Sequence, residues 1–142
     1  MSKSSERWVI KAGSSLVAGN DDGINKLFIK NLVLQVSQLL EEGIQVIIVS
    51  SGAVAKGMHE LNLNERPDSL NLLQAAAAIG QLGLIDSYKS EFSNFEIKTA
   101  QVLISHDDIA NRERYLNARN SLMTLLELRV VPIINENDSV SI

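Results

Sequence analysis

Residues 46–53 read Val-Ile-Ile-Val-Ser-Ser-Gly-Ala, and their order gives the clearest indication of the fold class. Its first half is short, unbroken and β-branched, which is typical of a strand covered on both faces. The serines and the glycine predict a tight turn, and we expect a helix of small residues from Ala53 onward. The same order begins at residues 8–10 (Trp-Val-Ile), where Lys11 and a turn at Gly13 follow an apolar run. A repeated strand–turn–helix unit favours parallel strands.

The other elements alternate in the same way. Apolar residues recur at helical spacing from Ile24 to Glu42, and Gly43 stands where that helix would end. Residues 61–67 predict a polar loop. We also expect helices at 70–92 and 116–128, a short helical segment opening at Asp107, and strands at 99–104 and 130–134. Strands that alternate with crossover helices predict an α/β fold, a three-layer α/β/α sandwich with a largely parallel sheet.

Length and composition exclude several classes of protein. The chain has 142 residues, which corresponds to about one domain. Its net charge is −4 with no basic block, which argues against nucleic-acid binding. The absence of cysteine excludes disulfides and a thiol nucleophile, and two histidines leave little for a zinc site. The polar N-terminus is no signal peptide and no apolar run reaches ~18 residues, so we expect a cytoplasmic protein that does not span a membrane.

Polar or glycine-containing turns follow all four predicted strands. Parallel sheets bind ligands at the carboxyl ends of their strands, so these turns predict one active edge. The turns are Lys11-Ala12-Gly13-Ser14-Ser15, Ser50-Ser51-Gly52, Ser105-His106-Asp107-Asp108 and Asn135-Glu136-Asn137-Asp138.

Each of the two glycine turns has two interpretations. In the first interpretation of the turn after residues 8–10, Lys11 supplies a positive charge and the glycine turn supplies backbone N–H groups to a phosphate. In the second, Lys11 is a strand-end lysine whose charged group extends to water. At Ser51 and Gly52, one interpretation is that the N-terminus of the following helix binds an anion. The other is that a serine caps this helix and Gly52 allows close packing. Together the two turns favour an anion site between glycine loops. The spacings of a P-loop and of a dinucleotide fingerprint do not occur.

The polar run that starts at Asn135 also has two interpretations. Its side chains can bind an amino group or a carboxylate of a ligand, or the run forms an ordinary turn. Four such residues in a row favour a function. Other features favour structural roles: Trp8 in the core, residues 112–115 on a solvated helix face, and the alanines 75–78 in close packing of a helix against the sheet. For Gly80-Gln81, contact with a ligand is the less favoured interpretation.

Five strings together resemble the amino acid kinase family, and in particular its members that phosphorylate glutamate. They cover nearly the whole chain in order, and the last two are the most specific, because other family members share only the glycine loops. The strings are Lys-Ala-Gly-Ser-Ser (11–15), Val-Ser-Ser-Gly-Ala-Val-Ala (49–55), Gln-Ala-Ala-Ala-Ala-Ile-Gly-Gln (74–81), Asn-Arg-Glu-Arg-Tyr-Leu-Asn-Ala-Arg-Asn (111–120) and Val-Pro-Ile-Ile-Asn-Glu-Asn-Asp (131–138).

This resemblance implies transfer of the ATP γ-phosphate to the side-chain carboxylate of L-glutamate, which gives glutamyl 5-phosphate and begins proline biosynthesis. It implies ATP and Mg²⁺ as cofactors, proline as a feedback inhibitor and a homo-oligomer, and it assigns no residue to a metal. The site residues that it implies are Lys11 as the catalytic and ATP-phosphate-binding lysine, Ser51 and Asp138 as glutamate-binding residues, and Gly13, Ser14 and Gly52 as backbone donors to phosphate.

The chain departs from the family pattern at two positions and in its length. Ala12 replaces a larger aliphatic residue, and Arg129 stands where a glycine commonly ends the preceding helix, so a left-handed cap is disfavoured there. The family continues past Asp138 with the rest of the glutamate site, the nucleotide pocket and a second lysine. We therefore expect residues 1–142 to be the N-terminal portion of an amino acid kinase domain that is inactive alone.

Two alternatives stay open. Another kinase of the family would act on an acetylated amino acid, aspartate or a nucleotide, and the string at 111–119 argues against it. A non-catalytic half-domain would bind an amino acid without turnover, and the missing C-terminal portion favours it for this chain.

Overall fold

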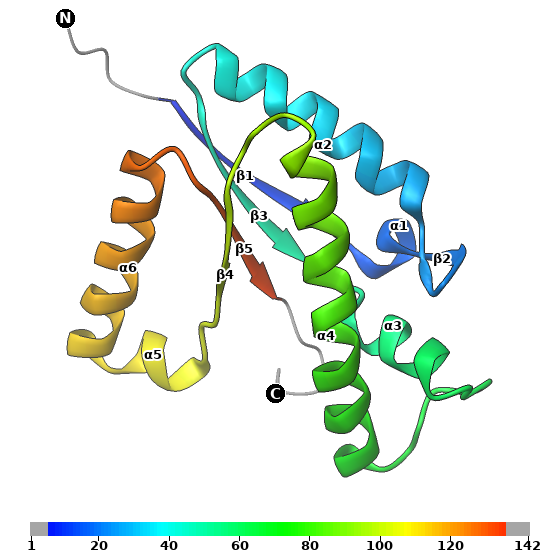
Figure 1. The fold of residues 1–142 in the computed structure, drawn as a ribbon. Coiled ribbons are helices and arrows are strands. Elements are labelled where there is room, and N and C mark those ends of the chain that lie inside the picture. The colour runs from blue at the N-terminus through cyan, green and yellow to red at the C-terminus, as the bar shows by residue number, and fades with distance from the viewer. Residues whose placement is uncertain (1–5, 136–142) are drawn as a thin grey trace, which may run out of the picture.

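Four strands form one sheet in the order β1-β3-β5-β4 in the computed structural model, which describes residues 6–135 (Figure 1). Every neighbouring pair of strands is parallel, as the sequence predicted. The strands are β1 (Arg7–Ala12), β3 (Gln45–Ser50), β5 (Val131–Asn135) and β4 (Thr99–Val102).

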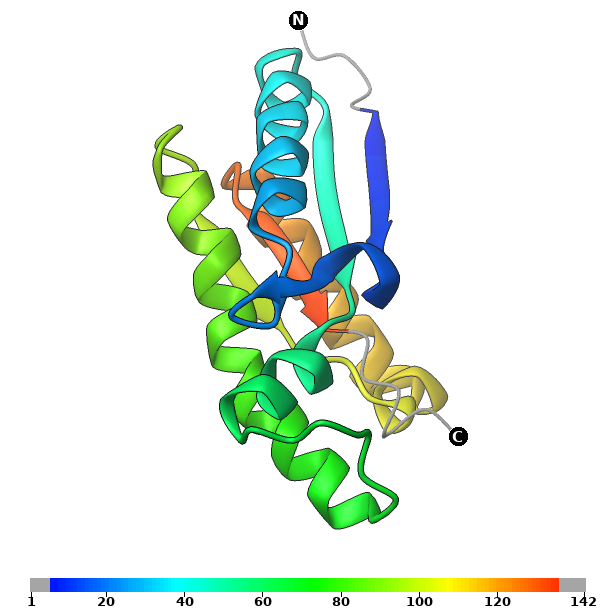
Figure 2. The same ribbon diagram turned by 90° about the vertical axis from the view of Figure 1, so that its right-hand side faces the viewer.

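Helices cover both faces of this sheet, which confirms the predicted three layers. Helices α2 (Lys26–Glu41) and α4 (Leu70–Ser93) lie on one face, and α5 (His106–Ala110) and α6 (Arg112–Glu127) lie on the other (Figures 1 and 2). Helix α3 (Ala53–Glu60) lies beside the part of α4 that runs past the carboxyl ends of the strands. Among residues 6–135, no helix combines the length and the apolar character that a membrane span requires.

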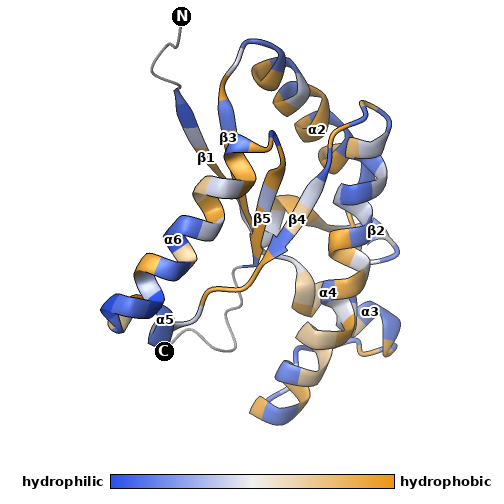
Figure 3. Cartoon of the chain, turned by 60° about the vertical axis from the view of Figure 1, so that its left-hand side comes forward, coloured by the Kyte–Doolittle hydropathy of each residue, from blue (hydrophilic) through white to orange (hydrophobic). Residues whose placement is uncertain are grey.

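The core lies between the sheet and the layer of α2 and α4. Residues of β3 and β5 that face this layer are fully or almost fully buried, as are the apolar stripes of both helices. The main contributors are Val46, Ile48, Val131 and Ile133 from the sheet and Val33, Val36, Tyr88 and Phe92 from the helices. Helix α6 is largely hydrophilic and buries only Leu126, so the second face is less fully covered (Figure 3).

Helices α3 and α4 pack backbone against backbone. A Cβ atom at Gly57 would overlap the backbone of Ala76, and one at Gly80 would overlap the carbonyl oxygen of Ala53. Ala76 and Ala77 are buried, whereas Ala75 and Ala78 are exposed. The alanine run therefore serves close packing as expected, but the partner is α3 and the expectation of packing against the sheet was wrong.

Two local expectations also differ from the structure. Trp8 was expected in the core, but 45% of it is exposed, because β1 is an edge strand with a single neighbour in the described sheet. Helix α6 begins four residues earlier than predicted, where the side chain of Asn111 accepts a hydrogen bond from the N–H of Arg114. The short elements α1 (Ser14–Val17) and β2 (Ala18–Asp21) were not predicted.

Arg129 adopts the left-handed conformation that the sequence analysis considered unfavourable for it. Its φ is +63°, directly after α6 ends. The guanidinium Nη2 donates to the carbonyl oxygen of Leu40 across the end of α2, at 3.4 Å. The turn after α6 thus keeps the left-handed geometry that a glycine would supply. The arginine adopts this geometry at the cost of backbone strain.

Candidate functional site

The carboxyl ends of three strands lie side by side. Ala12 of β1 is opposite Ser50 of β3, and Ser50 is opposite Asn135 of β5. The turns that follow β1 and β3 therefore start at the same level of the sheet, beside the end of β5. This arrangement brings together the segments that the sequence predicted at one active edge.

The two glycine turns are in direct contact. The N–H of Ser51 donates to the carbonyl oxygen of Ala12 at 2.9 Å. A Cβ atom at Gly52 would lie 2.7 Å from Cγ1 of Val17 in α1, and Gly52 has a φ of +116°. Both the contact and the left-handed backbone require glycine at this position. Gly52 therefore has the packing role of the second interpretation. Its contact with Val17 places the two turns against each other.

The helix that leaves β3 has an uncapped N-terminus. No side chain caps α3 at Gly52, so Ser51 is not the capping serine of the alternative interpretation. By contrast, side chains cap α2, α4, α5 and α6. The first N–H groups of α3 have no partner within the helix, and they lie at the positive end of its dipole. This N-terminus is suited to bind an anionic group.

Gly13 follows β1 in an ordinary extended conformation, with φ −75° and ψ +161°. Apart from Gly13 and its two chain neighbours, no atom of the described residues lies within 4 Å of the position that its Cβ would take. Neither the backbone nor the packing of the described chain requires glycine here, so the open space beside the turn can admit a ligand. Lys11 is exposed one residue before the end of β1, and Ser14 opens α1. The phosphate-binding roles of these residues stay predictions.

Ser50 and Tyr88 link the strand end to α4. Their hydroxyl oxygens are 2.8 Å apart in a fully buried position, and the Ser50 hydroxyl also donates to the carbonyl oxygen of Ser51 at 2.9 Å. A serine hydroxyl has one proton, so Tyr88 is the donor to Ser50. Burial raises the pKa of Tyr88 to about 12, because loss of solvent disfavours the charged phenolate.

The turn that follows β4 caps a helix. The Ser105 hydroxyl accepts from the N–H of Asp108, and the Asp108 carboxylate accepts from the N–H and the hydroxyl of Ser105. These hydrogen bonds lower the pKa of Asp108. The polar side chains of Ser105 and Asp108 are thus used in a capping box.

Two polar residues of the described chain have unsatisfied buried side-chain atoms: Asn135 at the end of β5 and Gln81 in α4. Of the buried side-chain atoms in residues 6–135, Oδ1 of Asn135 and both Nε2 and Oε1 of Gln81 have no hydrogen-bond partner. Contact of Gln81 with a ligand was the less favoured interpretation of the sequence. The available signal was its helical spacing, which puts a polar residue on the same stripe as the apolar Ala77 and Leu84. Asp138, the predicted glutamate-binding carboxylate, lies outside the described residues.

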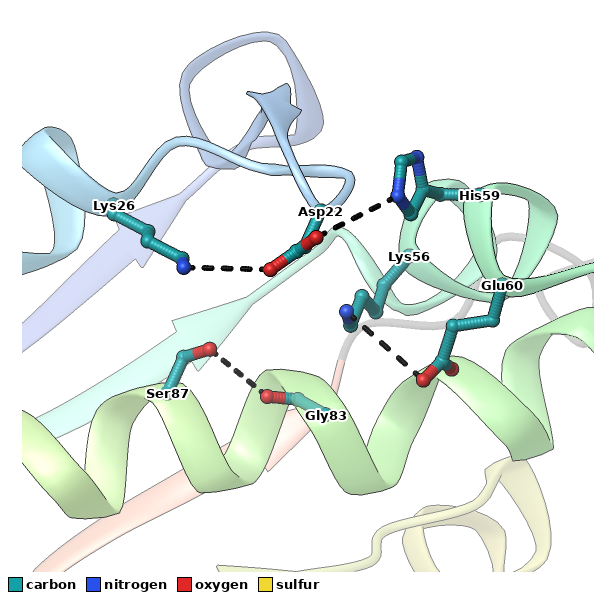
Figure 4. A network of polar contacts seen from close by, with 7 residues as sticks. All are labelled: Asp22, Lys26, Lys56, His59, Glu60, Gly83 and Ser87. Carbon is teal, nitrogen blue, oxygen red and sulfur yellow. Dashed lines mark hydrogen bonds and ion pairs between the residues drawn. The ribbon is translucent and has the colours of Figure 1, made fainter. Parts of the chain in front are cut away.

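A separate cleft of about 480 Å³ lies between α2, α3 and α4, and none of the strand-end residues lines it. Four of its charged side chains, Asp22, Lys26, Lys56 and Glu60, pair with one another or with a neighbour (Figure 4). Asp22 is 3.3 Å from Nζ of Lys26 and 3.8 Å from Nε2 of His59, and Lys56 is 3.9 Å from Glu60. The contact with His59 joins the turn at Asp22 to α3. Within the described part of the chain, no group of three His, Cys, Asp or Glu residues could hold a metal ion.

Comparisons with known proteins agree with this architecture. The model of the amino acid kinase family matches residues 6–142. A glutamate 5-kinase of Hydrogenovibrio crunogenus is 54% identical over 96% of the chain, and one of Saccharophagus degradans is 53% identical over 97%. The chain spans only 36% and 37% of the length of these relatives.

A solved structure shares the fold. The isopentenyl phosphate kinase of T. acidophilum, in its product complex, matches with a TM-score of 0.59 and 16% sequence identity. The match covers 94% of this chain and 58% of that protein.

Proposed function

The chain belongs to the amino acid kinase family, and we propose that it forms the N-terminal part of a kinase domain that phosphorylates the side-chain carboxylate of L-glutamate. The observation that carries this proposal is the 50–54% identity to glutamate 5-kinases over nearly the entire chain. The rest of the domain would lie in the longer protein that carries this chain, here called the full-length protein.

The proposed reaction forms an acyl phosphate. An oxygen of the glutamate side-chain carboxylate attacks the γ-phosphorus of ATP, the bond to the β-phosphate oxygen breaks, and ADP leaves with that electron pair. Such a transfer depends on holding donor and acceptor in line and on neutralising charge. The contact between the two glycine turns supports this proposal, because it places the Lys11 turn next to the uncapped N-terminus of α3.

We assign the phosphate side of the site to the turn after β1. Lys11 neutralises the transferring phosphoryl group, and backbone N–H groups of Gly13, Ser14 and Gly52 donate to phosphate oxygens. The open space at Gly13 supports this role, since a phosphate can approach the backbone closely there.

We assign the glutamate side to Ser51 and Asp138. The N–H of Ser51 is already bonded to Ala12, so its hydroxyl is the group that would hold the substrate. A carboxylate such as Asp138 repels the two carboxylates of glutamate, and its partner would be the α-ammonium group. The N-terminus of α3 then receives a carboxylate.

ATP is the proposed phosphoryl donor, and Mg²⁺ would arrive on its phosphates as part of the substrate. The described residues do not fit a protein-held Mg²⁺, because they contain no suitable cluster of ligands. Feedback inhibition by proline and a homo-oligomeric state belong to the same proposal and rest on the resemblance to glutamate kinases. A cytoplasmic location also belongs to it, because ATP is available there.

The test is a panel of phosphoryl acceptors for the full-length protein with ATP and Mg²⁺. ADP release should depend on L-glutamate and should not occur with L-aspartate, N-acetyl-L-glutamate, uridine monophosphate or isopentenyl phosphate. Turnover with one of the other acceptors would identify a different kinase of the family. Glutamate binding without ADP release would support the non-catalytic half-domain.

A further inference from the structure

Gln81 carries a buried amide that no described residue pairs. Only 9% of its surface is exposed, and within residues 6–135 neither Nε2 nor Oε1 has a hydrogen-bond partner. A buried amide that is left unpaired lowers the stability of the fold, and native proteins seldom keep one. An apolar residue of similar size would fill the same space without this cost. Packing alone therefore does not explain why this position has an amide side chain.

The position of Gln81 follows from the contacts of α4. Tyr88 binds Ser50 at the end of β3, and Gly80 lies against Ala53, the first residue of α3. Gln81 precedes Tyr88 by seven residues, or two helical turns, so it is on the same face and about 10 Å farther along the helix. At this point α4 has passed the carboxyl ends of the strands (Figure 1). The amide therefore lies beside the first turn of α3, at the candidate site.

Two other unsatisfied features occur at the same edge of the sheet. Among the described residues, no side chain caps the N-terminus of α3, and none pairs with the buried Oδ1 of Asn135 at the end of β5. Unpaired donors and acceptors from three elements at one edge indicate that a polar ligand completes the hydrogen bonding there.

We propose that the Gln81 side chain binds the amino-acid substrate directly, with Nε2 donating to a substrate carboxylate at the N-terminus of α3. A neutral amide strengthens the binding of a carboxylate without adding charge. Its Oε1 is left to accept from the ammonium group of the same ligand, so the side chain suits an amino acid better than a simple dicarboxylate. This inference rests on the proposed function, and it adds a substrate-binding residue from α4 to the two glycine turns.

The test is Gln81→Met in the full-length protein, which removes the amide and approximately keeps the volume. The KM for L-glutamate should rise at least tenfold, and the thermal shift that glutamate induces should be lost. Without ligand, the midpoint of thermal unfolding should stay the same or rise, because an unpaired buried group is removed. Gln74→Met makes the same change at an exposed position of α4 and should alter neither quantity.

Several outcomes would overturn the inference. A glutamate KM within twofold of the wild type would show that the amide does not bind substrate, and a clearly lower thermal midpoint with an unchanged KM would indicate a structural role. If Gln81→Met does not fold, Gln81→Asn, which withdraws the amide by one methylene group, should raise the KM, and an unchanged KM would again overturn it. The wild type is assayed first: absence of glutamate-dependent turnover would refute the proposed function itself, and this inference with it.

Discussion

The hydroxyl of Tyr88 donates to the hydroxyl of Ser50, 2.8 Å away, in the buried layer between α4 and the sheet. Ser50 is the last residue of β3, and the turn of Ser51 and Gly52 follows it directly. The hydrogen bond therefore fixes α4 relative to the turn at the candidate site. It also sets how far Gln81 lies beyond the strand ends.

This contact predicts a specific loss of stability at high pH. The pKa of Tyr88 is raised from 10.0 to about 12, so the neutral hydroxyl is favoured in the folded state. The contribution of neutral Tyr88 to the free energy of unfolding is fully present below pH 10, and it is lost as the pH rises from 10 to 12. By pH 11, the wild type should lose about 1.4 kcal/mol of unfolding free energy that Tyr88→Phe does not lose. Urea unfolding at pH 9 and pH 11 measures this difference, and Tyr115→Phe, at an exposed position, should behave as the wild type.

The two glycines of the site should respond differently to alanine. Gly52→Ala forces a side chain into the left-handed region and against Val17, so it should destabilise the protein by more than about 1–2 kcal/mol. Gly13→Ala should leave the thermal midpoint unchanged or slightly higher, because its backbone suits any residue. The added methyl group should nevertheless lower kcat/KM at least about tenfold by displacing the phosphate. Full activity of Gly13→Ala would mean that no ligand approaches this turn.

Lys11→Ala in the full-length protein should lower kcat by roughly 10²–10³-fold with little change in the KM for glutamate. A charge close to the transferring phosphoryl group acts mainly on the transition state. Steady-state kinetics with varied glutamate measures the two constants separately, and Lys89→Ala, at an exposed lysine of α4, is the matched control. A kcat within a few-fold of the wild type would return Lys11 to the interpretation of a strand-end lysine that reaches water.

Arg129 offers a test of backbone strain outside the site. Arg129→Gly and Arg129→Ala both remove the hydrogen bond to Leu40, but only alanine keeps the Cβ atom in the left-handed conformation. The glycine variant should therefore be more stable than the alanine variant by about 1 kcal/mol. Denaturant unfolding of the two variants gives this difference. Equal stabilities would indicate that the turn carries no strain from φ.

The strands and long helices could be predicted because their patterns are strong. An unbroken β-branched run such as residues 46–49 has few alternatives to a buried strand, and glycines at 43 and 52 mark a helix end and a helix start. The four-residue elements α1 and β2 are too short for a periodic pattern, so the sequence did not predict them. Trp8 was misplaced because hydrophobicity alone does not show which strand lies at the edge of a sheet.

The site was predicted in part for a similar reason. Glycine turns after apolar strands can be recognised locally, and the parallel sheet brings them together. The position of Gln81 could not be predicted, because it depends on tertiary contacts: the Tyr88–Ser50 hydrogen bond and the close packing of Gly80 on Ala53 bring it to the strand ends. No local sequence pattern indicates that its amide has no partner among residues 6–135.

The enzyme that we propose for this chain forms an acyl phosphate on the side chain of glutamate. Trapping with hydroxylamine tests this claim most directly, because an acyl phosphate reacts to a stable hydroxamate. The full-length protein with ATP, Mg²⁺ and L-glutamate should yield the hydroxamate of the side-chain carboxylate, identified by mass spectrometry, in an amount equal to the ADP released, whereas the 142-residue chain alone should yield none. ADP release without any hydroxamate, or a hydroxamate of the α-carboxylate, would contradict the claim.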